Sequence, residues 1–167
     1  MNSAVGSGDR VASRIFMFER VAACEKPIAL RDTSIYIVSK NDSFIWHKAH
    51  SLIGDCSKIV FHDAEDPSFT ISFSRDDYVL VVDIDVFECL DDAIDWLLKV
   101  RSINSSVPIV ILSDKFTYDD LTLQRSAIAD VSVRTPCTVK FLKGAIAQAI
   151  ENNGIYRKQL SNSSNVQ

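Results

Sequence analysis

The sequence predicts a doubly wound α/β fold, in which five parallel strands form one sheet and helices cover both of its faces. Apolar runs of strand length alternate with segments of helical period between about residues 32 and 154. Two of these runs, 78–83 and 108–113, are apolar on both faces, as central strands are when helices cover both sides of a parallel sheet. The length of 167 residues, with 47% hydrophobic and 24% charged residues, is typical of one globular domain.

The elements follow in order along the chain. Strands are predicted at 34–38, 57–61, 78–83, 108–113 and 131–133. Helices are predicted at 43–53, 90–103 and 138–150, where apolar residues recur at helical spacing, and at 117–127, where the pattern is weaker. The segment 64–75 is ambiguous, because Phe69, Ile71 and Phe73 alternate as in a strand although a crossover helix is expected there. We interpret it as a helix.

The chain divides into three parts. Residues 1–31 are expected to form a tail and a short extra helix, in which Ile15, Phe16, Phe18 and Val21 recur at roughly helical spacing. Residues 32–154 form the main domain. Residues 155–167 lose the apolar periodicity, so we expect a flexible C-terminal tail.

Composition disfavours several classes of function. Lys and Arg number 18 against 22 Asp and Glu, so no basic field would hold nucleic acid or anionic lipid. The apolar runs are too short to span a membrane, and four scattered cysteines indicate a reduced, cytoplasmic protein. His47 and His50 lie three residues apart on a predicted helix and could bind a metal together with Cys56, but zinc sites normally need four ligands, so we expect no metal there. With no glycine-rich phosphate loop, the usual nucleotide enzymes are excluded.

Candidate site residues are those that end the predicted strands. In doubly wound sheets, ligands bind at the carboxyl ends of the strands. These positions hold Ser39 and Lys40, Asp83 and Asp85, Ser113 and Asp114, and Thr135 and Pro136.

Three of the strand motifs resemble a known family. The sequences YVLVVD at 78–83, PIVILS at 108–113 and ADVSVRTP at 129–136 resemble the third, fourth and fifth strands of the receiver domain of two-component response regulators. The resemblance spans about residues 33–152 and implies a flavodoxin-like fold. A working receiver carries a phosphoryl group on an Asp that ends the third strand, and Mg²⁺ is held by that Asp and by an acidic pair ending the first strand. The resemblance places Asp83 as phosphoacceptor and Ser113 as the hydroxyl that senses phosphate.

The chain departs from the family at the other switch positions. Ser39 and Lys40 stand where the acidic pair belongs, and a hard divalent cation prefers carboxylate or carbonyl oxygens. Thr135 replaces the lysine that precedes the proline, here Pro136, and Ser132 replaces the aromatic residue of the fifth strand. We therefore expect a degenerate receiver site that binds no metal.

Asp83 has three readings. The first hypothesis is that Asp83 forms an ion pair with Lys40, whose ammonium group takes the place of the missing metal. The alternatives are that Asp83 is a solvated residue at the end of a strand or that it is a phosphoacceptor. We favour the ion pair. Asp85 is equally well explained as a loop carboxylate. The carboxylates of Asp91, Asp92 and Asp95 are expected to favour the first turn of a helix.

The expected function is that of a pseudo-receiver, a non-enzymatic protein-interaction module of bacterial signal transduction or transcription regulation that needs no cofactor. Its partner would be another regulator or a second copy of the chain. The binding surface would consist of the fourth and fifth predicted helices and the strand between them, and we expect a homodimer. The main alternative is a functional receiver, phosphorylated on Asp83 by a histidine kinase with Mg²⁺. A third class is an enzyme or a small-ligand sensor that uses the same crevice.

Overall fold

The computed structural model describes residues 30, 32–52, 55–64 and 78–164. The extra helix expected before residue 31 and nearly all of the predicted helix at 64–75 lie outside the described residues.

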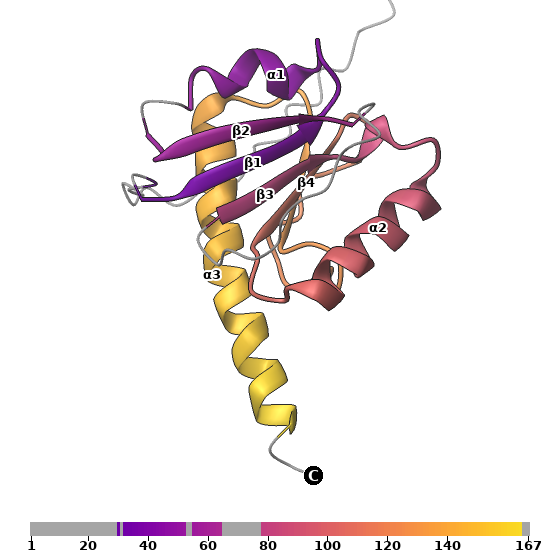
Figure 1. Cartoon of the computed structure of the whole chain (residues 1–167), viewed down its shortest axis with the longest axis vertical. Coiled ribbons are helices and arrows are strands. Elements are labelled where there is room, and N and C mark those ends of the chain that lie inside the picture. The colour runs from indigo at the N-terminus through magenta and orange to yellow at the C-terminus, as the bar shows by residue number, and fades with distance from the viewer. Residues whose placement is uncertain (1–29, 31, 53–54, 65–77, 165–167) are drawn as a thin grey trace, which may run out of the picture.

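A single sheet of five parallel strands organises the described chain (Figure 1). Its strand order is β2-β1-β3-β4-β5, which is the order of the flavodoxin-like fold. This confirms the predicted fold class. The strands are β1 (Ser34–Ser39), β2 (Lys58–Asp63), β3 (Tyr78–Asp83), β4 (Ile109–Ser113) and β5 (Val131–Arg134). The helices are α1 (Phe44–Ala49), the short 3-10 helix η1 (Ile84–Val86), α2 (Leu90–Ile103) and α3 (Val139–Ser164).

Two apolar cores lie on opposite faces of the sheet. Side chains alternate along a strand, so Ile35 and Ile37 of β1 join one core while Val38 joins the other. The first core packs α1 and α3 against the sheet, and the second packs α2 against it. Both faces of β3 are therefore covered, which explains why the strand is apolar throughout.

The helix predicted at 117–127 is wrong. The segment is irregular, and Asp120 forms an antiparallel bridge with Ser132, with N···O distances of 2.8 and 2.7 Å. The Asp120 carboxylate also accepts hydrogen bonds from the backbone N–H and hydroxyl of Thr122. Such local side-chain bonds compete with helix formation, and the bridge pairs part of the outer edge of β5.

The end of the last helix, predicted at residue 150, is also wrong: α3 continues to Ser164 and so includes residues 155–164 of the expected C-terminal tail. Residues 155–160 contain neither glycine nor proline, and a helix that is already nucleated extends at little cost. Figure 1 shows this C-terminal half of α3 projecting beyond the sheet. In the described part of the chain, no helix combines the length and apolar character needed to cross a membrane.

Candidate functional site

The strand ends converge as predicted at the carboxyl edge of the sheet. The parallel register places Val38 beside Val82, so that Ser39 at the end of β1 lies near Asp83 at the end of β3. Asp83 is in turn paired with Leu112, next to Ser113 at the end of β4. Three polar side chains from three central strands therefore meet at one edge.

Asp83 is half-buried and is held by two hydrogen bonds. The Ser39 hydroxyl donates to Asp83 Oδ2 at 2.9 Å, and the backbone N–H of Asp85 donates to Oδ1 at 3.2 Å. The second bond caps η1, which begins directly after β3. Burial raises the pKa of the Asp83 carboxyl above its ordinary value, the two hydrogen bonds oppose the rise, and the nearby carboxylates of Asp85 and Asp114 add to it.

Asp85 connects the end of β3 to the end of β4. It accepts hydrogen bonds from the Ser113 hydroxyl at 2.9 Å and from the Asp114 N–H at 2.8 Å. Lys115 Nζ lies 3.3 Å from its Oδ1, but that side chain is 77% exposed and adds little. Burial alone would raise the pKa of Asp85, yet the Asp114, Ser113 and Lys115 groups outweigh it and hold the pKa below its ordinary value. The two neighbouring carboxyls are thus shifted in opposite directions.

The expected ion pair between Lys40 and Asp83 is wrong. Among the described residues, the groups that contact the Asp83 carboxylate are the Ser39 hydroxyl and the Asp85 N–H, and Lys40 is exposed. A serine hydroxyl one residue earlier reaches the carboxylate because Ser39, the last residue of β1, is fully buried at the strand end.

The fifth strand contributes less to this edge. Thr135 and Pro136 follow β5, the outer neighbour of β4, and the Thr135 N–H donates to the Ser113 carbonyl at 3.0 Å. The Thr135–Pro136 peptide bond is cis. Ser132 is buried, and its hydroxyl accepts a hydrogen bond from Arg125 at 3.1 Å.

One further carboxylate at this edge was missed by the sequence analysis. Asp63 ends β2 beside Ser39, and Asn41 Nδ2 donates to its Oδ2. The strand predicted at 57–61 ends two residues too early, which is why Asp63 was not recognised as a strand end.

The described residues hold no group of three or more His, Cys, Asp or Glu side chains arranged to bind a metal ion. His47 and His50 are exposed, and the Cys56 thiol donates to the Leu52 carbonyl at 3.3 Å.

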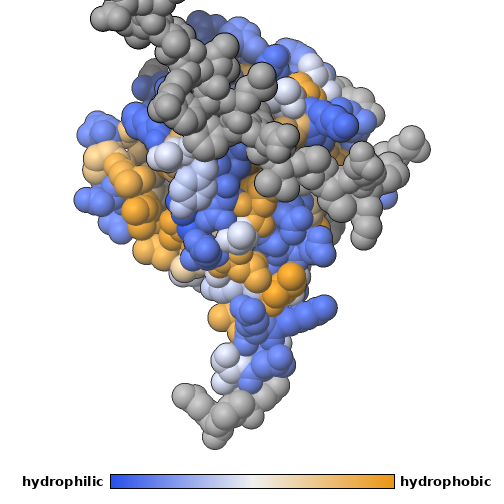
Figure 2. All heavy atoms as spheres, turned by 180° about the vertical axis from the view of Figure 1, so that it is seen from behind, coloured by the Kyte–Doolittle hydropathy of each residue, from blue (hydrophilic) through white to orange (hydrophobic). Residues whose placement is uncertain are grey.

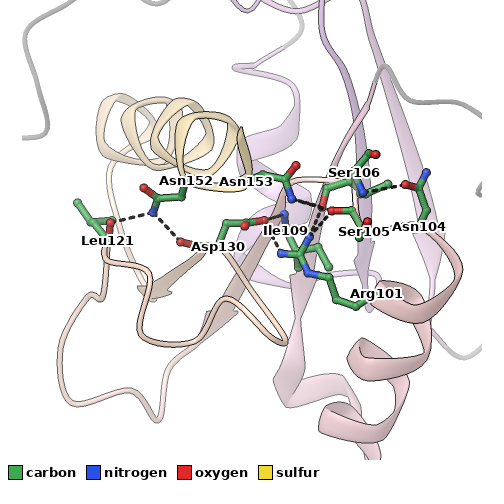
Figure 3. A network of polar contacts seen from close by, with 10 residues as sticks. Arg101, Asn104, Ser105, Ser106, Ile109, Leu121, Asp130, Asn152 and Asn153 are labelled. Carbon is green, nitrogen blue, oxygen red and sulfur yellow. Dashed lines mark hydrogen bonds and ion pairs between the residues drawn. The ribbon is translucent and has the colours of Figure 1, made fainter. Parts of the chain in front are cut away.

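A second polar cluster, also missed, lies at the opposite end of the strands (Figure 3). Arg101 of α2 and Asp130, which precedes β5, form a buried ion pair at 2.6 Å. Asp130 also accepts from the Ile109 N–H at 2.7 Å, and the adjacent Asn152 and Asn153 of α3 donate to nearby carbonyls. The signal was present in the sequence: Arg101 follows Leu97 by four residues and so falls on the apolar face of its helix.

This cluster has a structural role. Burial raises the pKa of Asp130, while the Arg101 guanidinium opposes that rise. The bonds join α2 and α3 to the residues that begin β4 and β5.

The chain matches no protein-family model, no curated protein and no solved structure. Function must therefore be inferred from the two clusters and from the surface.

Proposed function

We propose that this chain is a pseudo-receiver, a cytoplasmic receiver-like domain of bacterial signal transduction or transcription regulation that acts by protein binding rather than by catalysis. Support comes from the strand order of the flavodoxin-like fold together with an aspartate at the end of β3. The resemblance of three strand motifs to response-regulator receivers points in the same direction.

The observation that carries the proposal is a continuous series of hydrogen bonds across the carboxyl edge. Ser39 bonds to Asp83, Asp85 bonds through its N–H to Asp83, and Ser113 bonds to Asp85. Ser39 occupies a position where a receiver needs a metal-binding carboxylate. The Ser113 hydroxyl, which a receiver would turn toward phosphate, already donates to Asp85 and accepts from the Lys115 N–H. These bonds favour one fixed conformation over a phosphorylation switch.

The surface expected for the partner needs revision, because the segment predicted as the fourth helix is irregular. Exposed apolar side chains instead lie on α2, at Leu90, Leu98 and Ile103. The same helix begins with exposed Asp91 and Asp92, so its outer face suits a partner with basic side chains.

A second copy is the other proposed partner. Two acidic α2 faces would repel each other, so a twofold dimer requires a different surface. The projecting half of α3 offers one, because its Ile155 is 39% exposed.

Phosphorylation distinguishes the proposal from its main alternative. The chain is incubated with acetyl phosphate and Mg²⁺, and its intact mass is measured beside that of Asp83→Asn. We expect no added phosphoryl group in either protein. A phosphoryl adduct that forms on the wild-type chain and is lost in Asp83→Asn would overturn the proposal in favour of a functional receiver served by a histidine kinase.

Light scattering over a range of concentrations tests the homodimer. We expect a dimer that Ile155→Glu dissociates and that Leu98→Glu, on α2, leaves intact. A monomer at every concentration would contradict the proposed self-association.

A further inference from the structure

A groove runs between the projecting half of α3 and the amino-terminal ends of the strands, on the opposite edge of the sheet from Asp83. It consists of two adjoining hollows of about 460 and 560 Å³, which share Ser106, Gly154 and Arg157 in their walls. One hollow reaches Tyr78 at the start of β3, and the other reaches Leu160 near the end of α3.

Gly154 lies inside this groove, in the interior of a 26-residue helix. A glycine there costs about 0.5–1 kcal/mol relative to alanine, because it loses more conformational freedom on folding. A Cβ placed on Gly154 would meet no atom of the described residues within 4 Å. No neighbour in the described part of the chain therefore requires the glycine. A glycine has no side chain, so another segment can approach the helix backbone closely at this point of the groove. Such an approach would explain why a residue that destabilises the helix stands here.

Ile150 continues this face of the helix toward the sheet. It lies four residues before Gly154, lines the groove and is 37% exposed, while Leu160 lines the far end and is 42% exposed. Figure 2 shows hydrophobic atoms exposed among hydrophilic ones on the projecting end of the molecule. The groove thus offers apolar contacts on both sides of the glycine.

The chain itself enters beside this groove. Leu30 is buried in the core, and Asp32 and Thr33 line one hollow. The 29 residues before Leu30 include an apolar group at 15–21, Ile-Phe-Met-Phe-Glu-Arg-Val. Nine residue-to-residue steps lead from Val21 to Leu30 and reach up to about 30 Å, whereas α3 from Ile150 to Ser161 rises only about 16 Å. A segment tethered in this way has an effective concentration in about the millimolar range.

We propose that residues 15–21 of this chain dock in the groove, where the apolar side chains contact Ile150 and Leu160 and the segment passes over Gly154. The inference does not rest on the proposed function: it uses neither the carboxyl edge nor the outer face of α2, and Ile155, the residue proposed for the dimer contact, is not among the residues that line the groove.

Hydrogen exchange of the full chain, read by mass spectrometry on peptides covering 15–21, tests the docking. We expect these amides to exchange at least about tenfold more slowly than those of an unstructured segment. A tenfold protection requires only a modest free energy of docking. In Gly154→Leu the protection should be lost. Leucine is a better helix former than glycine, and its Cβ would meet no neighbour among the described residues, so this variant should fold at least as stably as the wild type.

Gln159→Leu, which adds the same side chain on another face of α3, is the matched control and should keep the protection. Three results would overturn the proposal: exchange of 15–21 at the unstructured rate in the wild type, equal protection in Gly154→Leu, or protection that disappears on dilution. The last result would assign the groove to a segment of a second copy.

Discussion

The buried ion pair between Arg101 and Asp130 permits a quantitative test of what holds the sheet and its helices together. The substitution Arg101→Met keeps the length and the apolar stem of the side chain but removes the guanidinium. Arg101 Nη1 donates to the Ser105 and Val107 carbonyls, but Asn153 Nδ2 donates to the same two oxygens. Those carbonyls therefore keep a partner, and the main loss falls on Asp130.

The expected cost follows from the burial of Asp130. Its side chain is fully buried, and that of Arg101 is 5% exposed. Removing one member of such a pair leaves an uncompensated charge and costs about 3–5 kcal/mol of unfolding free energy. In the double variant Arg101→Met, Asp130→Asn no charge remains, and the asparagine oxygen can still accept from the Ile109 N–H. We therefore expect the double variant to be less destabilised than the sum of the single variants by about 2–3 kcal/mol.

Urea unfolding followed by tryptophan fluorescence measures these free energies. Burial already raises the pKa of Asp130, and removing Arg101 removes an opposing effect, so the carboxyl in Arg101→Met should take up a proton as the pH falls. The cost of Arg101→Met should accordingly shrink between pH 8 and pH 5. Lys99→Met, an exposed change on the same helix, should stay within about 0.5 kcal/mol of the wild type. A cost of Arg101→Met below about 1 kcal/mol with no pH dependence would refute the reasoning.

Four further predictions concern the carboxyl edge, the polar cluster at the opposite end of the strands, and the core. Asp83→Asn should raise the unfolding free energy at pH 7, within the range of about 0.5–2 kcal/mol typical of stabilising changes, because the raised pKa of Asp83 means that its ionised form opposes folding. Asp85→Asn, whose carboxyl has a lowered pKa, should instead cost about 1–2 kcal/mol. Asn152→Ala should cost about 1–3 kcal/mol, since its amide bonds to the Leu121 and Asp130 carbonyls inside the fold. Leu142→Ala, in the core under α3, should cost about 2–5 kcal/mol.

The pH dependence separates the two aspartates. The gain from Asp83→Asn should vanish as the pH falls through the pKa of Asp83 toward about 3.9, the value of an unfolded aspartate, because the wild-type carboxyl is then neutral. The loss from Asp85→Asn should persist down to about pH 3.9 and disappear as the pH falls further, through its lowered pKa. Urea unfolding from pH 3 to pH 8 measures both, and shifts of the same sign would contradict the assignment. Costs near zero for Asn152→Ala or Leu142→Ala would contradict the packing described for them.

The strands and their order in the chain could be predicted from the sequence by itself. The apolar runs at 78–83 and 108–113 do not alternate with polar residues, and their short length and β-branched residues indicate strands that are covered on both faces. The same reasoning located Ser39, Asp83 and Ser113, since parallel strands all end at one edge of the sheet. Strong periodicity likewise predicted α2 at its observed bounds.

Only the tertiary structure decided which side chains meet at that edge and where the irregular segments run. The choice of Ser39 over Lys40 as the neighbour of Asp83 depends on which residue the register turns inward, and charge alone favoured the lysine. The segment around Asp120 pairs with β5 through backbone bonds, which leave no periodic pattern in the sequence. The continuation of α3 to Ser164 likewise leaves no periodic pattern in the sequence. The part of the helix that packs on the sheet is already formed, so the helix extends at little cost beyond its last buried residue, where no apolar side chains recur at helical spacing.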